Sequence, residues 1–559
     1  MERFFRIFGR EYGNINQAAF LLGSFAFLSQ ILGLLRDRFI AHFIGPSPEL
    51  DAYYAAFRIP DLIFISIASL ASITVLIPFV TAKLADGKIT AEARKFLDDV
   101  FTVFLFAMLL VSLVVFFLMP HLVALVVPGF APALQAKVIM LSRIMLLSPI
   151  LLGLSNLFGS ITQLFRKFFI YALSPIFYNF GIILGILFLY PIFGISGLAA
   201  GVVLGALMHF LIQAFAGRGS GFAPRFSVAI NFKEIKRVVL TSLPRTLGLS
   251  FNNIALISII SLASYLQGGS ISVFNFSLNI QSVPLGIIGL SYAVAAFPTL
   301  TRSYASGKLE EFRDHLGSAT RAIIFWSLPV TFLFIVLRAQ IVRVVLGSGS
   351  FSWENTRLVA ASLAIFSISI MAQGLIALFA RAYYAGGNTK RPLLINFFSS
   401  LSIILFSVVF LYIFQHYSSF KYFIEAILKV SDVAGTEVLM LPLAYSCGTI
   451  INFLLLGFFT KGDFMKKNQF ITKTFFQNLS ASFFMGVVAY IGLNIFSPLF
   501  GLDTFWGVFL QGFISGVLGI GAGVFLLYLF GSQELKDLGK TLHTKFWRAK
   551  VIAPPQEGL

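Results

Sequence analysis

Long apolar segments, separated by short polar connections, recur along almost the whole chain. A helix needs roughly 20 mainly apolar residues to cross a bilayer, and fourteen segments reach that length. The pattern therefore predicts an all-α integral membrane protein with about 14 transmembrane helices. The segments begin near Ala18, Asp51, Phe96, Val138, Phe169, Ile195, Ile235, Ser270, Thr320, Val359, Pro392, Val438, Thr474 and Thr504.

Lys and Arg gather on every second connection between these segments. The second connection carries Lys83, Lys88, Arg94 and Lys95, whereas the connection around Pro191 has no basic residue. Because positive loops face the cytoplasm, the alternation places both termini there and requires an even number of spans. The basic start of the chain leads straight into the first span, without the cleavage site of a signal peptide.

The composition supports a membrane protein. Only 11% of the 559 residues are charged and 58% are hydrophobic, whereas soluble domains carry about 25% charged residues. The net charge of +18 comes mostly from the basic connections, so it indicates topology rather than nucleic-acid binding. One cysteine, six scattered histidines and the lack of a GxxxxGK(S/T) loop leave no pattern of an enzyme, a metal site or a bound cofactor.

Two short motifs occur twice. PFVTAKLADGK begins at Pro78 and PTLTRSYASGK at Pro298, an offset in numbering of 298 − 78 = 220. SPIFYNF has a proline, Pro175, four positions before an Asn, and RPLLINF has the same spacing at Pro392, an offset of 392 − 175 = 217. One period covers six spans, an even number, so the second copy enters the membrane in the same direction as the first.

We therefore expect two parallel six-helix bundles around a central cavity, followed by two C-terminal helices. This architecture favours a transporter that works by alternating access, although a duplicated scaffold without transport would show the same repeat. The expected divisions are an N-terminal bundle at 1–216, a C-terminal bundle at 217–460, two further helices at 461–531 and a basic cytoplasmic tail at 532–559.

Six charged residues lie close together in the first two predicted spans: Arg36, Asp37, Arg38, Asp51, Arg58 and Asp61. A charge in hydrocarbon costs at least a few kcal/mol. One interpretation is a cap of paired charges at the outer interface. The other is a cavity for an anionic substrate, because arginine binds phosphate in bidentate fashion.

Neighbouring helix positions project about 100° apart. We therefore expect Asp37 to meet a partner on another helix while Arg36 faces a cavity, and Arg38 to snorkel toward the interface. Asn275 and Asn279, four residues apart in the eighth span, share a helix face. They are candidates for hydrogen bonds to the sugar or peptide groups of a substrate, or for ties between helices.

The segment LSQILGLLRDRFIAHFIGPSPELDAYYAAFRIPDL, residues 28–62, resembles the N-terminal signature of the MurJ/MviN lipid II flippases. These belong to the multidrug/oligosaccharidyl-lipid/polysaccharide exporter superfamily. The resemblance extends, in order, over most of the first twelve spans. It includes VPGF at 127–130, ISGLAAGVVLGALMH at 195–209, FPTLTRSYASG at 297–307, LGSGSFSWENT at 346–356 and ARAYYAGGNTKRP at 380–392.

The resemblance implies transport of lipid-linked peptidoglycan precursor from the inner to the outer leaflet, through a cationic cavity that meets the pyrophosphate. By position, Arg36 and Asp37 match the family's Arg-Asp pair, Asp51 matches its Asp at the start of the second span, and Arg58 matches a basic position before a Pro. Together with Asn275 and Asn279, these are the expected substrate-binding residues.

Several positions depart from the family pattern. Gln30 stands where the family has Arg, and Phe64 and Ile65 stand where it has a basic pair. Ser69 replaces a Glu, and the family's Asp-Arg pair of the eighth span falls on Leu278 and Asn279. The expected cavity is therefore less cationic than in the family.

Four functions remain open on the sequence. The first is a lipid II flippase in the bacterial cytoplasmic membrane, and the second is a flippase for another undecaprenyl-linked oligosaccharide. The third is a MATE-like ion-coupled drug exporter, for which Asp37 and Asp51 are the candidate coupling residues, and the fourth is a scaffold. The expected partners are a lipid-linked glycan pyrophosphate, membrane lipids, and a coupling ion or the membrane potential, and we expect a monomer.

Overall fold

The computed structural model describes residues 15–68, 76, 79–81, 83–85, 88–165, 167–218, 224–464, 469–501 and 504–546. Nearly all of them are helical. Their only strands are β1 (Leu84–Ala85) and β2 (Lys88–Ile89), a short antiparallel pair. The predicted all-α class is confirmed.

The elements follow one another along the chain in two groups. In the first part they are α2 (Ile15–Phe43), α3 (Pro48–Ala56), α4 (Arg58–Ile63), η1 (Phe64–Ala68), α6 (Ala91–Val126), α7 (Pro132–Met145), α8 (Leu147–Leu164), α9 (Phe168–Leu184), η2 (Gly185–Leu189), α10 (Tyr190–Phe193), α11 (Ile195–Arg218), α12 (Phe232–Ala263) and α13 (Ser270–Pro284). In the second part they are η3 (Leu285–Leu290), α14 (Ser291–Ala305), α15 (Leu309–Val336), α16 (Arg338–Leu346), α17 (Trp353–Ser367), α18 (Ile370–Ala385), α19 (Lys390–His416), α20 (Ser418–Leu428), η4 (Thr436–Leu439), α21 (Met440–Phe464), α22 (Gln469–Phe496), α23 (Phe505–Leu529) and α24 (Gln533–Phe546).

Eleven helices of the described part are long and apolar enough to cross a membrane, and a twelfth span results if the bent pair α17 and α18 is counted as one. The chain is therefore a multi-pass membrane protein. The other two predicted spans correspond to α2 and to the stretch that begins with α3, α4 and η1, which runs into residues 69–75, outside the described residues. Fourteen spans thus stay a prediction.

Several helices begin at a side chain that accepts a hydrogen bond from a backbone N–H of the first turn. Ser47, Thr90, Ser352 and Thr504 do this for α3, α6, α17 and α23. Serine and threonine are favoured at this position because the first turn has no intrahelical acceptors for its N–H groups. These caps fix where each helix leaves its polar connection.

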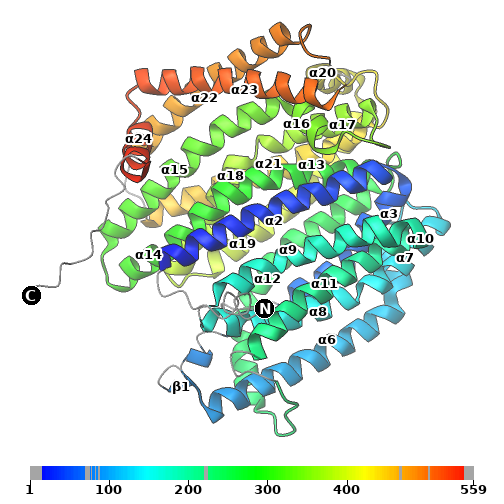
Figure 1. Ribbon diagram of the computed structural model, residues 1–559, viewed down its shortest axis with the longest axis vertical. Coiled ribbons are helices and arrows are strands. Elements are labelled where there is room, and N and C mark those ends of the chain that lie inside the picture. The colour runs from blue at the N-terminus through cyan, green and yellow to red at the C-terminus, as the bar shows by residue number, and fades with distance from the viewer. Residues whose placement is uncertain are drawn as a thin grey trace, which may run out of the picture. The chain divides into compact units, whose positions relative to one another are not determined.

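The chain forms two compact units, each made of several chain segments. The first comprises Met1–Val283, Val342–Ser369 and Gly387–Leu456, and the second comprises Pro284–Ile341, Ile370–Gly386 and Gly457–Leu559. Within the first unit, α2, α9, α11 and α8 pack in succession (Figure 1). Within the second, α22 packs against both α15 and α23.

Glycines allow the closest helix packing of the first unit. A Cβ added to Gly181 would meet the Cα of Gly205, and one added to Gly185 would meet the Cα of Gly201. Helices in a membrane associate through such close backbone contacts, because burial from lipid supplies little driving force. The α9–η2–α11 packing therefore depends on the absence of side chains at these positions.

The described residues include three π-helices, and two of them, η1 and η3, stand at matching positions of the predicted repeat, whereas the position one period after η2 falls inside the α-helix α19. η1 begins at Phe64 and η3 begins at Leu285, an offset in numbering of 285 − 64 = 221. This offset agrees with those of the two repeated sequence motifs, 298 − 78 = 220 and 392 − 175 = 217. A π-helix is rare and often marks a functional position, so its recurrence supports the repeat independently of the motifs.

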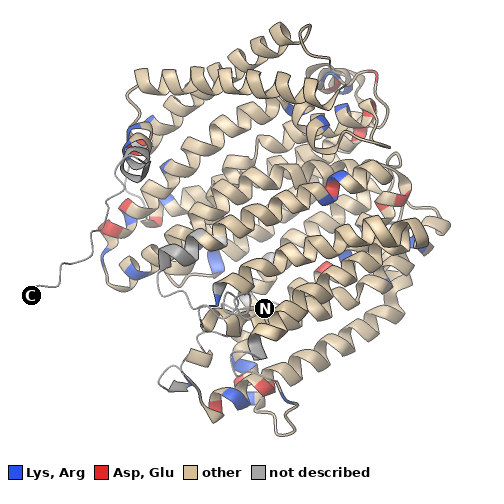
Figure 2. Cartoon of the chain, in the orientation of Figure 1, with Lys and Arg blue, Asp and Glu red and all other residues tan. Residues whose placement is uncertain are grey.

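Most charged residues of the described part lie near helix ends (Figure 2). The group at Arg36, Asp37 and Arg38 is an exception, because it lies within the length of α2, before the last turn that ends at Phe43. The charged group that interrupts the apolar segment in the sequence is therefore also a charged group away from a helix end in the structure.

We expect Gly185→Ala to lower the stability of the protein, because the new methyl group would collide with the backbone of α11. Overpacking of this kind costs roughly 1–3 kcal/mol. The measurement is thermal unfolding of the purified protein in detergent. Gly521→Ala is the matched control, since a Cβ at Gly521 meets nothing within 4 Å. Equal melting temperatures of the two variants would contradict the packing argument.

Candidate functional site

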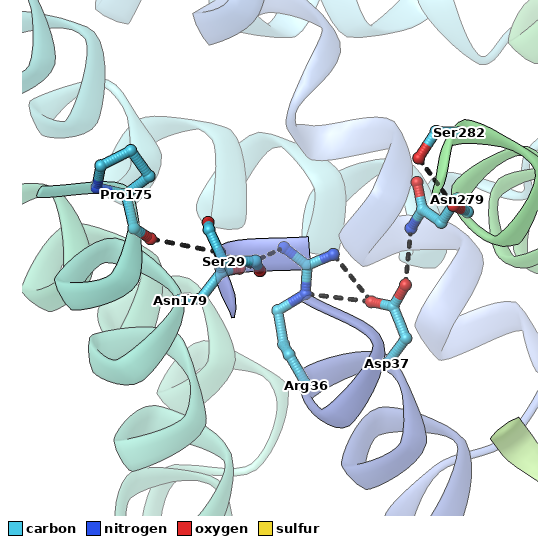
Figure 3. A network of polar contacts seen from close by, with 7 residues as sticks. All are labelled: Ser29, Arg36, Asp37, Pro175, Asn179, Asn279 and Ser282. Carbon is cyan, nitrogen blue, oxygen red and sulfur yellow. Dashed lines mark hydrogen bonds and ion pairs between the residues drawn. The ribbon is translucent and has the colours of Figure 1, made fainter. Parts of the chain in front are cut away.

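Arg36 and Asp37 form an ion pair in α2 (Figure 3). Arg36 donates from Nε and Nη2 to Asp37 Oδ1, at 2.9 and 2.8 Å. The other carboxylate oxygen, Oδ2, accepts from Nδ2 of Asn279 in α13 at 2.9 Å. Asp37 thus meets another helix as predicted. The expectation that Arg36 points elsewhere was wrong in part, because its long side chain bends back to its neighbour.

The other end of the Arg36 guanidinium reaches Asn179 in α9. Arg36 Nη1 donates to Asn179 Oδ1 at 3.2 Å, while the amide of Asn179 donates to Ser29 in α2 and to the carbonyl of Pro175. Asn179 was not among the predicted site residues. The repeated Pro-x-x-x-Asn spacing was the signal that could have identified it.

Arg58 at the start of α4 contacts Asn275 of α13. Its Nη2 donates to Asn275 Oδ1 at 2.6 Å, and Asn275 Nδ2 donates to the carbonyl of Ile271 at 2.7 Å. The Nε of Arg58 is buried and has no hydrogen-bond partner among the described residues. A buried unpaired donor on a cation costs free energy, so a ligand acceptor at this point would be favourable.

Asp51 in α3 is only 1% exposed and binds the N-terminus of α13. Its Oδ2 accepts from the backbone N–H of Gly269 at 2.7 Å, and its Oδ1 accepts from the N–H and hydroxyl of Ser272 at 2.7 and 2.6 Å. A carboxylate is well placed there, because the first N–H groups of a helix lack partners and carry partial positive charge. Asp51 therefore acts as a cap that joins α3 to α13.

The three contacts form a polar ladder along α13. Its rungs are Ser272, Asn275 and Asn279, which bind Asp51 of α3, Arg58 of α4 and Asp37 of α2. Positions i, i+3 and i+7 share one helix face, so the ladder follows a single stripe. All six predicted site residues belong to this arrangement, and all lie in the first unit.

Arg38 contacts the end of another helix, and its predicted reach toward the membrane interface stays a prediction. Its guanidinium donates to the carbonyls of Val344 and Val345, at 2.5 and 3.3 Å, in the last turn of α16. A helix C-terminus has unpaired carbonyls and partial negative charge, which suit a cation. Just beyond, the N–H of Ser350 donates to the carbonyl of His42 at 2.9 Å. These contacts hold the end of α2 against residues 344–350.

The site holds two guanidinium groups with different partners. Arg36 contacts the Asp37 carboxylate and the Asn179 amide, whereas Arg58 contacts the Asn275 amide. In the described part no group of three His, Cys, Asp or Glu side chains is suited to a metal ion. Phe64 and Ile65, where the family has a basic pair, lie in η1, and Ser69 lies outside the described residues.

The fold is that of a membrane transporter. A solved structure titled "Lipid II flippase MurJ, inward closed conformation" aligns over 93% of this chain and 99% of its own, with a TM-score of 0.73 and 22% identity. A MATE transporter of the MOP superfamily, in an inward-facing conformation, aligns over 79% of this chain and 98% of its own, with a TM-score of 0.62 and 18% identity. These likenesses define the class of fold.

The sequence comparisons define the family. The family model "Lipid II flippase MurJ" matches residues 40–419, more than half of the chain, and the chain therefore belongs to the MurJ family. A Rhizobium tropici protein named "Probable lipid II flippase MurJ" is 29% identical over 401 residues, 68% of this chain and 74% of its own. The "Lipid II flippase MurJ" of Burkholderia cenocepacia is 24% identical over 387 residues, 68% of this chain and 75% of its own. The comparisons do not favour the drug-exporter, other-glycan or scaffold interpretations.

We expect Asp51→Asn to destabilise the protein, because an amide cannot accept all three hydrogen bonds that the carboxylate accepts. Hydrogen bonds to a charged group contribute roughly 1.5–3 kcal/mol each, so a clear fall of the melting temperature in detergent should follow. Glu49→Gln is the control. It lies two residues away and loses only an exposed ion pair with Lys137, which is worth little. A melting temperature of Asp51→Asn equal to that of Glu49→Gln would refute the capping role.

Proposed function

We propose that this protein carries lipid II, the lipid-linked peptidoglycan precursor, from the inner to the outer leaflet of the bacterial cytoplasmic membrane by alternating access. Membership of the MurJ family supports this assignment, as do relatives that are named lipid II flippases. The proposal includes both termini in the cytoplasm, as the positive connections indicate, and a monomer as the working unit.

The observation that carries the proposal is the pair of guanidinium groups on the polar ladder. Three nitrogens of Arg36 donate hydrogen bonds to Asp37 and Asn179. The buried Nε of Arg58 has no hydrogen-bond partner among the described residues. Arginine is suited to pyrophosphate, because its planar fork matches two phosphate oxygens and its charge persists in a low-dielectric site. We infer that the pyrophosphate binds at Arg58 first and reaches Arg36 by displacing a neutral amide.

The contacts of α2 and α3 with residues 269–272 and 344–350 are the closure that must open during transport. They consist of hydrogen bonds to backbone groups, made by Asp51, Arg38 and His42. Each such bond contributes about 0.5–3 kcal/mol net. Moving one charge through about 100 mV supplies about 2.3 kcal/mol. The closure comprises several such bonds, so their sum exceeds the free energy that one charge gains from the membrane potential, and we infer that substrate binding supplies the rest.

The proposed divisions of the chain follow the repeat. We infer one six-helix bundle at 1–216 and a second at 217–460, with two further helices at 461–531 and a basic tail at 532–559. The offset between the π-helices η1 and η3 supports this division, because it places one π-helix at the same point of each bundle.

The test is complementation of a bacterium depleted of its own lipid II flippase. We expect the wild-type chain to restore growth and both Arg36→Ala and Arg58→Ala to fail. Removing one partner of a buried, hydrogen-bonded charge costs roughly 2–5 kcal/mol, which corresponds to about thirtyfold or more in affinity. Arg36→Lys should rescue only partly, because an ammonium group lacks the bidentate fork.

The matched control is Lys308→Ala, which removes a cation from an exposed ion pair with Glu311 and should leave rescue unchanged. Membrane levels of every variant are measured in parallel. If the wild-type chain is present at normal levels and does not rescue, lipid II is the wrong substrate. If both arginine variants rescue as well as Lys308→Ala does, the binding site lies elsewhere.

A further inference from the structure

Three aspartates, Asp37, Asp51 and Asp61, lie in α2, α3 and α4, and they differ in how many of their carboxylate oxygens accept hydrogen bonds. Asp37 has both oxygens occupied, by Arg36 and Asn279. Asp51 has both occupied, by Gly269 and Ser272. The side chain of Asp61 has no hydrogen bond or ion pair with any described residue. The two carboxylates that the sequence suggested for ion coupling are thus already satisfied, and the third is not.

Asp61 nevertheless lies inside the helix assembly. Its helix, α4, packs against α6, α7, α8 and α12 in the first unit and continues directly into η1. The Asp61 side chain is half-buried, so part of its surface remains accessible to solvent. A carboxylate in such a place can exchange a proton with water while still sensing nearby charge, because the surrounding helices weaken dielectric screening.

Arg58 lies three residues before Asp61 in α4, so the two side chains share one face of that helix. Tyr178 of α9 lies within electrostatic reach of both Asp61 and Arg36. A phosphate anion bound at Arg58 would cancel that cation and add a like charge beside the carboxylate, which favours its protonated form.

We propose that Asp61 is the proton-binding residue of the transport cycle, taking up one proton as the anionic head group binds at Arg58 and releasing it as the head group leaves. This inference rests on the proposed function. The step changes no bond of the substrate: one proton from the aqueous phase joins the Asp61 carboxylate, and the same proton returns to water on release.

The other titratable groups on the packed helices are engaged elsewhere or lie near helix ends. α8 has no Asp, Glu, Lys, Arg or His. Tyr54 of α3, whose ring packs on Phe276, lies near Arg58. The remaining groups are Glu92, Arg94, Lys95, Asp98, Asp99 and His121 of α6, Lys137 and Arg143 of α7, and Lys233, Glu234, Lys236 and Arg237 of α12. Arg245 also belongs to α12, but its side chain lies outside the described part of the structure.

A proton suits this site better than a metal ion. Metal cations in proteins require several oxygen ligands arranged around them, and the described residues hold no cluster of three acidic or histidine side chains. A proton requires only one carboxylate. Because Asp61 lies one turn from Arg58, substrate binding at Arg58 changes how strongly Asp61 binds a proton.

The experiment measures proton uptake on binding. Lipid II is titrated into the purified full-length protein by calorimetry, in buffers of different ionisation enthalpy, between about pH 6 and pH 8. Both phosphates of a disubstituted diphosphate are fully ionised in this range, so uptake reports on the protein. We expect the wild type to take up as much as one proton and its affinity to fall up to tenfold per pH unit as pH rises.

Asp61→Asn should bind lipid II with an affinity that no longer depends on pH, since its amide resembles the protonated carboxyl. Asp61→Glu keeps a carboxylate and should retain uptake, which separates proton binding from folding. Asp314→Asn, on the exposed surface of α15, is the matched control and should behave as the wild type. Unchanged uptake by Asp61→Asn would overturn the proposal.

The two proposals fail in different ways. If the wild type binds lipid II at every pH without proton uptake, the role of Asp61 is refuted and lipid II transport stands. If the wild type does not bind lipid II, but binds a farnesyl-diphospho-sugar with proton uptake that Asp61→Asn abolishes, the substrate assignment is refuted and the coupling residue stands.

Discussion

The polar ladder on α13 is the constraint around which the first unit is organised. Charged groups within a bilayer need partners, and one face of a single helix supplies them to three others: Ser272 to Asp51, Asn275 to Arg58 and Asn279 to Asp37. The partners on α13 are neutral, but Arg36 is also ion-paired with Asp37. Arg58, which has no ion pair with a described residue, therefore keeps more of its attraction for an anion, while α2, α3 and α4 remain held in place.

The rungs also lie at different points along α13. The first and last rungs are two helical turns apart, which is about 10 Å along a helix axis. The first rung, at Asp51, is a helix cap that uses both carboxylate oxygens, and the last, at Asp37, is shared with an ion pair. Separation of the ladder can therefore proceed rung by rung, with a smaller barrier than simultaneous loss of all its hydrogen bonds.

Hydropathy predicted most of the fold, because a helix in lipid depends on its own composition more than on distant residues. The same local information singled out Arg36, Asp37, Asp51 and Arg58. It could not supply their partners. Nothing in the sequence around Ser272 indicates that it binds Asp51, because the contact exists only where α3 packs against α13. The hydrogen bond from Arg36 to Asp37 depends on side-chain torsions, which the spacing of the residues does not determine. The contact between Arg38 and α16 joins segments that are far apart in the chain, which no local pattern records.

The positions of η1 and η3 bear on how the two proposed repeats evolved. A π-helix is mostly a single-turn bulge inside an α-helix, and η1 and η3 place such a bulge at corresponding points of the two proposed repeats. If the two repeats arose by duplication, one bulge present before that event accounts for both. The charges of α2 and the amides of α13, which differ between the proposed repeats, would then be later changes.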